Sequence, residues 1–202
     1  MTSRHVPSSW PLDPRNDEAE RIVEAQHGDV TAFNQLVLTY QDLVFNIARR
    51  LVGDDDTASD LTQEAFLSAY RHLDQFKGGS FRAWLLRIVT NASYDVLRSR
   101  RHQAKESLDQ LMEDTAFDAP DPSDLPELLA LRQETIQVIE EAIHLLPFEQ
   151  RSVLVLCDVH GLSYEEAAVT LQLNAGTLKS RLSRARRRLR DYLIQRRELW
   201  EG

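Results

Sequence analysis

The chain has 202 residues, 42% of them hydrophobic and 28% charged, which is enough to bury the core of one or two small soluble domains. Its formal net charge at pH 7 is −8, from 24 Lys and Arg against 32 Asp and Glu side chains. The single cysteine, Cys157, excludes an internal disulfide, and no apolar run reaches the roughly 18 residues of a membrane span. We therefore expect a cytoplasmic protein without membrane insertion.

The N-terminal half of the chain predicts a tail followed by one helical domain. Residues 1–16 contain three prolines and lack an apolar core of signal-peptide length, which predicts a flexible tail. Over residues 32–52 apolar side chains recur at steps of three and four, the spacing of an amphipathic helix. Two further helices are expected at about 57–73 and 80–101, separated by a glycine pair that breaks the helical pattern. The predicted helical domain spans residues 17–104.

The helix expected at 57–73 has an apolar seam and a separate polar face. Asp60, Gln63 and Glu64 lie at positions i, i+3 and i+4, so a helix presents them together on one side. The seam on another side consists of Leu61, Ala65, Ala69 and Leu73. Taken alone, a glutamine between two acids is typical of a solvated surface.

The helix expected at 80–101 carries a basic and aromatic ribbon opposite its apolar side. Residues 77–105 hold seven basic side chains and one acidic one, Asp95. Cations interleaved with rings and an amide suit single-stranded nucleic acid, where bases stack and cations follow the phosphates. Two alternatives remain open: the ribbon is an ordinary solvated face, and Trp84, which borders it, belongs to the core. The ribbon consists of Arg87, Asn91, Tyr94, Arg98 and Arg101.

An acidic segment separates this domain from a second one. Residues 106–126 contain seven acidic side chains, no basic one and three prolines, which predicts a flexible linker and disfavours a packed helix. At roughly 5–6 Å × √n, a random coil of this length spans about 25 Å. A second helical domain is expected over residues 127–197, followed by a short tail over 198–202.

The second domain has the pattern of a helix-turn-helix. Ser163 followed by Glu166 forms a capping-box signature, which predicts the start of a helix that runs to about Leu171. After a short break, a second helix opens near Gly176. Its apolar seam is Leu178, Leu182, Ala185 and Leu189, and its opposite face carries hydroxyls and cations. A recognition helix needs this arrangement, because the seam fixes the helix while the other face enters the major groove.

The basic residues are concentrated in two parts of an acidic chain. Residues 179–197 hold nine basic side chains and one acidic one, and 77–105 form the other cluster. Such segregation indicates binding of a polyanion at two places. For the C-terminal cluster, the alternative is a solvated basic face on a bundle helix.

The sequence offers no recognisable catalytic or metal-binding motif. The six histidines are scattered, without cysteine partners or an i, i+4 pair. The glycine pair at 78–79 lacks the strand-to-helix context of a phosphate-binding loop. We therefore expect no metal, no cofactor and no catalytic activity.

Five stretches, in this order, resemble the extracytoplasmic-function (ECF) group of bacterial sigma-70-type RNA polymerase sigma factors over about residues 20–195. They read AFNQLVLTYQDLVFNIARRLVGD, ASDLTQEAFLSAYRHLDQF, FRAWLLRIVTNASYDVLRSRRH, LPFEQRSVLVL and GLSYEEAAVTLQLNAGTLKSRLSRARRRLR. The resemblance implies an all-α protein of two small domains that binds core polymerase, recognises and melts promoters and directs transcription initiation. Residues 17–104 correspond to sigma region 2, which binds the minus-ten element, and 127–197 to the region 4 helix-turn-helix, which binds the minus-thirty-five element.

The resemblance also implies roles for individual residues. Asp60, Gln63 and Glu64 match the family's docking face for the β′ clamp helices of core polymerase. The loop at 74–81 matches the one that pockets a flipped base of the single strand. The implied minus-ten contacts are Phe76, Lys77, Ser80, Phe81, Trp84, Arg87, Asn91, Tyr94, Arg98 and Arg101. The implied minus-thirty-five contacts are Thr177, Lys179, Ser180, Arg181, Ser183, Arg184 and Arg187.

Further partners implied by the resemblance are the β flap of the polymerase and an anti-sigma factor. The acidic linker would thread polymerase channels that later hold nucleic acid. Ser183 stands where some members have an aromatic residue, so the preferred minus-thirty-five sequence cannot be transferred from a relative. Two other functions are alternatives: a stand-alone helix-turn-helix regulator, which leaves the ribbon and polar face of the first domain unexplained, and a helical enzyme acting on a phosphorylated substrate.

Overall fold

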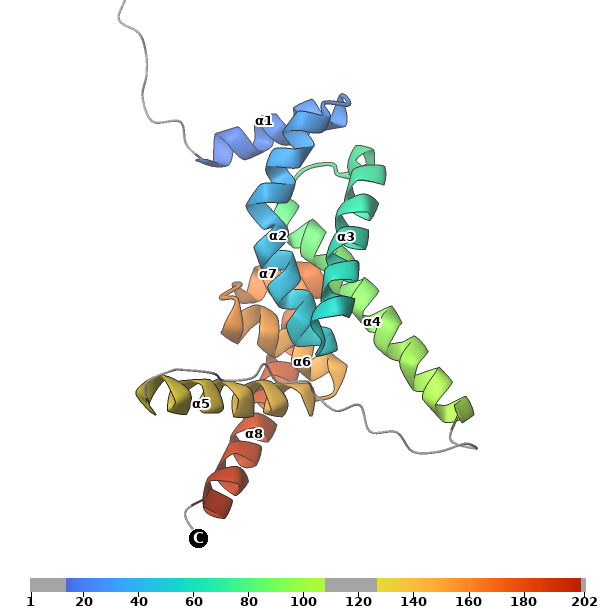
Figure 1. Ribbon diagram of the computed structural model, residues 1–202. Coiled ribbons are helices and arrows are strands. Elements are labelled where there is room, and N and C mark those ends of the chain that lie inside the picture. The colour runs from blue at the N-terminus through green and yellow to red at the C-terminus, as the bar shows by residue number, and fades with distance from the viewer. Residues whose placement is uncertain (1–13, 108–126, 201–202) are drawn as a thin grey trace, which may run out of the picture.

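The computed structural model of the protein describes residues 14–107 and 127–200, with side chains over 17–103 and 135–196. The described residues form helices joined by short turns, with no strand among them (Figure 1). This confirms the all-α fold class. The elements are α1 (Pro14–Gln26), α2 (Val30–Val52), α3 (Asp55–Arg71), the 3-10 turn η1 (Leu73–Gln75), α4 (Phe81–Ser107), α5 (Glu127–His144), α6 (Phe148–Leu154), the π-helical turn η2 (Val155–Val159), α7 (Tyr164–Leu171) and α8 (Ala175–Trp200).

Local chemistry explains where the early helices begin and end. The Asp29 carboxylate accepts hydrogen bonds from the first backbone N–H groups of α2, and the Asp54 carboxylate does the same for α3. Between these two helices Gly53 adopts φ +98°, a left-handed conformation that terminates α2 and that other residues reach only with strain. The chain therefore reverses within three residues, and α2 and α3 pack side by side (Figure 1).

Helices α1 to α4 share one apolar core. The seams that periodicity predicts for α2 and α3 are buried, including Leu36, Ile47 and Leu61. On α4 the buried side is wider than predicted, because Thr90 and Ser93 are buried as well. Their hydroxyls donate to backbone carbonyls one turn earlier, at 2.7 and 2.8 Å, so the polar groups are satisfied inside the helix.

Helices α5 to α8 form a second helical unit around the predicted recognition helix. The seam of α8 packs inward, with Leu178 and Ala185 fully buried and Leu182 2% exposed. Opposite it lies the apolar run of α6 and η2, which includes Cys157 at 9% exposure. Burial raises the pKa of the Cys157 thiol, and Asp158 adds to this effect. The cysteine is therefore a small core side chain, as its apolar neighbours in sequence predict.

The two helical units also contact each other. Helix α2 packs against α5 and α6, and α4 packs against α7 (Figure 1). Arg151 of α6 donates hydrogen bonds to the backbone carbonyls of Leu51, at the end of α2, and His144, at the end of α5. Arg50 of α2 pairs with Glu140 of α5 at 3.1 Å. The two units and their connecting segment are predicted from the sequence, but this contact surface is not.

Three predicted boundaries shift by a few residues. Helix α1 begins at Pro14, inside the predicted tail, with the proline at a position where its missing N–H needs no partner. Helix α4 continues to Ser107 and α8 to Trp200, beyond the predicted starts of the linker and of the C-terminal tail. The remainder of the tails and of the acidic linker lies outside the described residues. Among the helices that are described, none is long and apolar enough to span a membrane.

Candidate nucleic-acid interface

Caps and a tight turn hold α7 and α8 in the helix-turn-helix arrangement. Both halves of the predicted capping box form: the Ser163 hydroxyl accepts from the Glu166 backbone N–H at 3.1 Å, and the Glu166 carboxylate accepts from the Ser163 N–H at 2.9 Å. Gln172 ends α7 with φ +53°, and the Asn174 side chain then caps α8 by accepting from the Thr177 N–H at 2.8 Å. The turn thereby fixes the position of α8 relative to α7.

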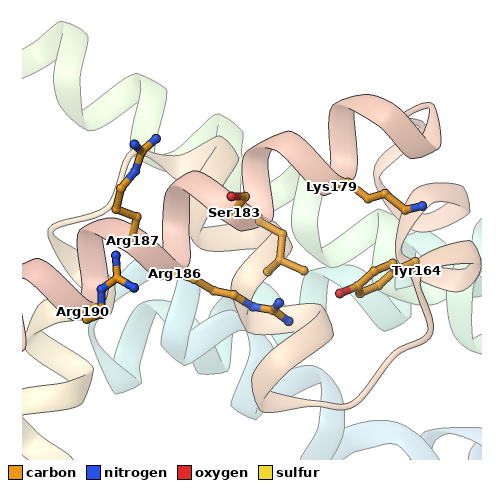
Figure 2. A pocket seen from close by; sticks show the side chains of 7 residues that line it. Tyr164, Lys179, Ser183, Arg186, Arg187 and Arg190 are labelled. Carbon is orange, nitrogen blue, oxygen red and sulfur yellow. The ribbon is translucent and has the colours of Figure 1, made fainter.

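The residues predicted to read duplex DNA lie on the first turns of α8. Arg181 and Thr177 are half-buried, and the others are exposed on the side away from the buried seam. Figure 2 shows that several side chains around Ser183 line a shallow cavity of about 430 Å³. The cavity is lined by Tyr164, Lys179, Leu182, Ser183, Arg186, Arg187 and Arg190. Such a surface suits contacts to phosphates and base edges in a major groove.

One arginine of α8 is held by a carboxylate of the π-helical turn η2. The Arg186 guanidinium donates to both Asp158 oxygens, through Nε at 2.8 Å and Nη2 at 2.6 Å, and these bonds raise the pKa of Arg186. Asp158 sits in η2, so the π-helical turn anchors the recognition helix. Sequence reasoning missed this pair, because 28 residues separate its members and the motif marks Arg186 only as one of several cations.

The loop between α3 and α4 encloses a second cavity, of about 280 Å³. Gly78 and Gly79 have φ of +99° and +91°, left-handed conformations that glycine adopts without the strain of a Cβ. Ser80 caps α4, since its hydroxyl accepts from the Ala83 N–H at 3.1 Å. The cavity is lined by Gln75, Phe76, Lys77, Gly78, Gly79, Ser80, Ala83, Trp84, Arg87 and Val169, the last from α7.

Packed aromatic rings form one side of this cavity. The Phe76 and Trp84 ring centroids are 5.5 Å apart, and Phe81 lies 5.7 and 5.6 Å from them. Phe81 is only 2% exposed and does not line the cavity, so its contact with a base stays a prediction that this arrangement does not favour. The Phe81 ring packs against the rings of Phe76 and Trp84 from the core and supports them. Trp84 is half-buried, which reconciles both sequence interpretations: it packs on the core and lines the cavity.

The basic and aromatic ribbon runs along the length of α4. Arg87 is half-buried at the cavity, while Asn91, Arg98 and Arg101 are exposed. Tyr94 is 41% exposed, and its ring packs against Phe148 of α6, with centroids 5.2 Å apart. The ribbon therefore forms as predicted, but the second helical unit covers part of it.

The polar face predicted on α3 forms a separate surface. Asp60, Gln63 and Glu64 are all exposed, whereas Leu61 and Ala65 on the neighbouring side are buried. Among the described residues, no group of three His, Cys, Asp or Glu side chains converges as it would around a metal ion.

Comparisons with known proteins agree with this arrangement. The family described as Sigma-70 region 2 matches residues 36–103, and that described as Sigma-70, region 4 matches residues 136–189. The ECF RNA polymerase sigma factor SigE of Mycolicibacterium smegmatis is 35% identical over 191 residues, covering 93% of this chain and 72% of the relative. The ECF RNA polymerase sigma-E factor of Escherichia coli is 37% identical over 169 residues, covering 82% and 88%.

Solved structures give the same result for the fold. The sigma factor RpoE of Bartonella quintana, solved with the anti-sigma factor NepR, matches with a TM-score of 0.65 and 31% identity, covering 82% of this chain and 98% of that one. CnrH, solved with the cytosolic domain of CnrY, matches with a TM-score of 0.66 and 25% identity, covering 89% and 98%. The two family matches, the curated relatives and these folds together establish that the chain belongs to the ECF group of sigma-70-type RNA polymerase sigma factors.

Proposed function

We propose that the chain performs sigma-factor function in the cytoplasm through two nucleic-acid surfaces. The first turns of α8 read the minus-thirty-five element as duplex, and the loop at 74–81 with the α4 ribbon holds the melted minus-ten strand. The proposal is carried by one observation: a capped recognition helix and a glycine-hinged aromatic cavity occur on separate helical units of one chain. A duplex reader alone needs only the first of these.

Each surface has the chemistry for its expected task. Arginine can contact a guanine edge through two donors, a discrimination of roughly 1–3 kcal/mol, and further cations neutralise phosphates. A captured base is unpaired at a cost of a few kcal/mol, which stacking in an aromatic pocket offsets by roughly 1–3 kcal/mol per base. Phe76 and Trp84 supply rings at the cavity, and Lys77 and Arg87 supply cations beside them.

Run-off transcription with purified core polymerase over a fragmented genome tests this function. We expect transcripts that begin a fixed distance downstream of two shared sequence elements. Failure of the chain to bind core polymerase, or a bound complex that starts no transcript, would overturn the proposal. Specific footprinting of duplex by the free chain alone, without any effect of core polymerase, would support the stand-alone regulator instead.

The exposed triplet on α3 is our candidate for the β′ clamp helices. Its side chains are free of the core and form one polar face. The charge reversals Asp60→Lys and Glu64→Lys should together weaken core binding at least tenfold. Asp42→Lys, at another exposed acid on α2, is the control for each single reversal and should leave core binding unchanged. If the α3 reversals and Asp42→Lys weaken core binding equally, the α3 triplet is not the docking face for the β′ clamp helices.

Other partners follow from the family and from the solved relatives. We propose that an anti-sigma factor binds this chain, since RpoE was solved with NepR. The β flap would bind the region 4 unit. The acidic linker at 106–126 would occupy a polymerase channel; replacing its acidic side chains with amides should impair holoenzyme assembly or initiation, and unchanged initiation would refute that role.

A further inference from the structure

Helix α1 contacts the loop that encloses the α3–α4 cavity. This helix precedes the first family match, which begins at residue 36, and although most of it falls in the predicted domain of residues 17–104, the sequence assigns no role to any of its residues. Its last residue, Gln26, extends its side chain to the backbone of the turn before the glycine pair. The Gln26 Nε2 donates to the carbonyl of Leu73 at 2.9 Å and to that of Phe76 at 2.8 Å. These contacts join residues 47 and 50 positions apart.

The chemistry of this contact is specific to a primary amide of glutamine length. A side-chain amide carries two N–H donors on one nitrogen, so it can bridge two carbonyls at once. The two carbonyls lie at the two ends of one turn, because the Phe76 N–H itself donates to the Leu73 carbonyl at 3.1 Å. Gln26 therefore fastens both ends of the turn. Glutamate has the same shape but would point carboxylate oxygens at two carbonyl oxygens.

The fastened turn supports one wall of the cavity. Phe76 connects the two: its carbonyl accepts from Gln26 at 2.8 Å, and its ring packs on that of Trp84 with centroids 5.5 Å apart. Beyond Phe76 the chain continues through Lys77 and two glycines with left-handed φ, which give the loop little stiffness of its own. The Gln26 contact, which precedes the glycines, therefore directly affects the position of the Phe76 ring at the cavity.

A second contact fixes α1 itself against the same aromatic cluster. The Tyr40 hydroxyl of α2 donates to the Glu18 carboxylate of α1 at 2.6 Å, and the Tyr40 ring packs on Phe81 with centroids 5.8 Å apart. Ile22 of α1 is buried, so the helix is held by packing between its two polar contacts. Helix α1 is thus a fixed support from which Gln26 reaches the turn.

We propose that Gln26 is a positioning residue for base capture: it sets the place of Phe76 in the cavity and thereby the selectivity of promoter melting. The inference rests on the proposed function of the cavity. It adds helix α1 to the machinery that holds the melted strand, and it predicts an effect on base recognition that is separate from folding, core binding and duplex reading.

The test compares Gln26→Glu and Gln26→Met with wild type and with Gln35→Met, the same change at an exposed position of α2. Holoenzymes are titrated with non-template-strand oligonucleotides of the minus-ten element in which each base in turn is replaced by an abasic site. Wild type and Gln35→Met should lose affinity strongly at the captured base. For both Gln26 variants we expect that dependence to shrink, and open-complex formation on duplex promoter to slow about tenfold, as the loss of two hydrogen bonds implies.

Thermal midpoint and core affinity separate positioning from folding. The proposal expects core affinity to match the Gln35→Met control and the midpoint to fall by no more than the loss of two hydrogen bonds implies. It expects Gln26→Glu to be at least as impaired as Gln26→Met. Abasic-site profiles of the Gln26 variants identical to wild type would overturn the positioning role. A fall in thermal midpoint and core affinity large enough to explain the slower open-complex formation would also overturn it. If wild-type holoenzyme itself starts no transcript, the proposed function fails; if wild type is active and selective and only the Gln26 effect is missing, the positioning role alone fails.

Discussion

Tyr94 of α4 and Phe148 of α6 pack ring against ring, with centroids 5.2 Å apart and planes inclined by 54°. A residue assigned to single-stranded DNA therefore contacts the other helical unit of its own chain. Two further contacts join the two units. Val169 of α7 lines the α3–α4 cavity, and the Arg82 guanidinium of α4 donates to the His160 carbonyl at 3.4 Å. In this arrangement the second unit covers part of the α4 ribbon on which we propose that single-stranded nucleic acid binds.

Phe148→Ala should increase the affinity of the free chain for a single-stranded minus-ten oligonucleotide. The substitution removes the ring that covers Tyr94, and interfaces between units of one chain are weak enough for one aromatic contact to matter. We expect a several-fold gain, measured by fluorescence anisotropy. Bound to core polymerase, the variant and wild type should bind the oligonucleotide alike if core binding separates the units. Unchanged affinity of the free variant would mean that the contact does not limit access.

The Arg50–Glu140 ion pair should contribute measurably to the contact between the units. Its atoms are 3.1 Å apart, and the side chains are only 23% and 14% exposed, so solvent screens the pair less than a surface pair. Arg50→Glu or Glu140→Arg alone should destabilise the chain by about 1–3 kcal/mol, because each leaves like charges opposed. The double reversal should recover a large part of that loss in a denaturation experiment. Additive losses in the double variant would contradict coupling across the interface.

Acid should loosen the same contact surface. Burial, followed by the charges of Arg151 and Arg49, lowers the pKa of His144 from 6.5 to about 4. Burial, followed by the charges of Arg50 and Arg82, lowers the pKa of His160 to about 4 as well. Both rings are therefore neutral in the folded chain but bind a proton near pH 6.5 once exposed.

The expected direction follows from proton linkage. Between pH 6.5 and 4 the opened or unfolded chain binds more protons than the folded one, so stability falls as pH decreases through this window. The thermal midpoint should drop between pH 7 and pH 5, and His144→Gln should reduce the slope. A midpoint that is constant or rises toward pH 5 in the wild-type chain would contradict the buried, neutral state of these histidines.

Much of this architecture is predictable from local sequence, because helical seams and caps are encoded within a few residues. Leu178 and Leu182 are buried as their spacing predicts, and the Ser163–Glu166 capping box forms. What the sequence does not reveal depends on contacts between distant segments. Phe81 stands in a recognised motif, yet its burial depends on how Phe76 and Trp84 pack above it.

Long-range polar contacts are likewise not predictable from local sequence. Gln26 is a plain polar residue at the end of a helix, and only the fold brings it to carbonyls some 50 residues away. Arg151 lies in a motif that the sequence analysis used for recognition alone, but its guanidinium binds the carbonyl of Leu51, 100 residues away. Such partners leave no periodic signal, because a single hydrogen bond requires no repeated pattern.

Gly79→Ala should impair promoter melting while leaving the duplex surface intact. Gly79 has φ +91° with open space where a Cβ would be, so the substitution acts through backbone strain alone, about 1–2 kcal/mol. We expect slower open-complex formation and unchanged binding of a minus-thirty-five duplex. Gly161→Ala is the control, since Gly161 also has a left-handed φ, +65°, and open space where a Cβ would be, but lies outside the cavity and away from helix α1. If both variants slow melting equally, general destabilisation explains the effect.

Asp158→Asn should increase DNA binding by the region 4 unit but reduce its selectivity. In the wild-type chain the Asp158 carboxylate holds Arg186 through two hydrogen bonds, which fixes this cation beside the reading face and offsets its charge. The amide removes one negative charge and releases the arginine, so contacts to phosphates should strengthen for any sequence. Because the released side chain no longer has one orientation, discrimination between bases should weaken.

Anisotropy titrations of minus-thirty-five duplex and a scrambled duplex, each at several salt concentrations, measure both quantities. We expect the affinity ratio of the two duplexes to fall several-fold and the salt dependence to steepen. Asp191→Asn is the control: Asp191 is also acidic and next to α8 cations, but its oxygen lies 3.8 Å from Arg190 without the two-point contact. It removes the same charge, so it should raise affinity for both duplexes alike and keep their ratio. Equal loss of selectivity in both variants would show that charge, and not the fixed Arg186 geometry, sets discrimination.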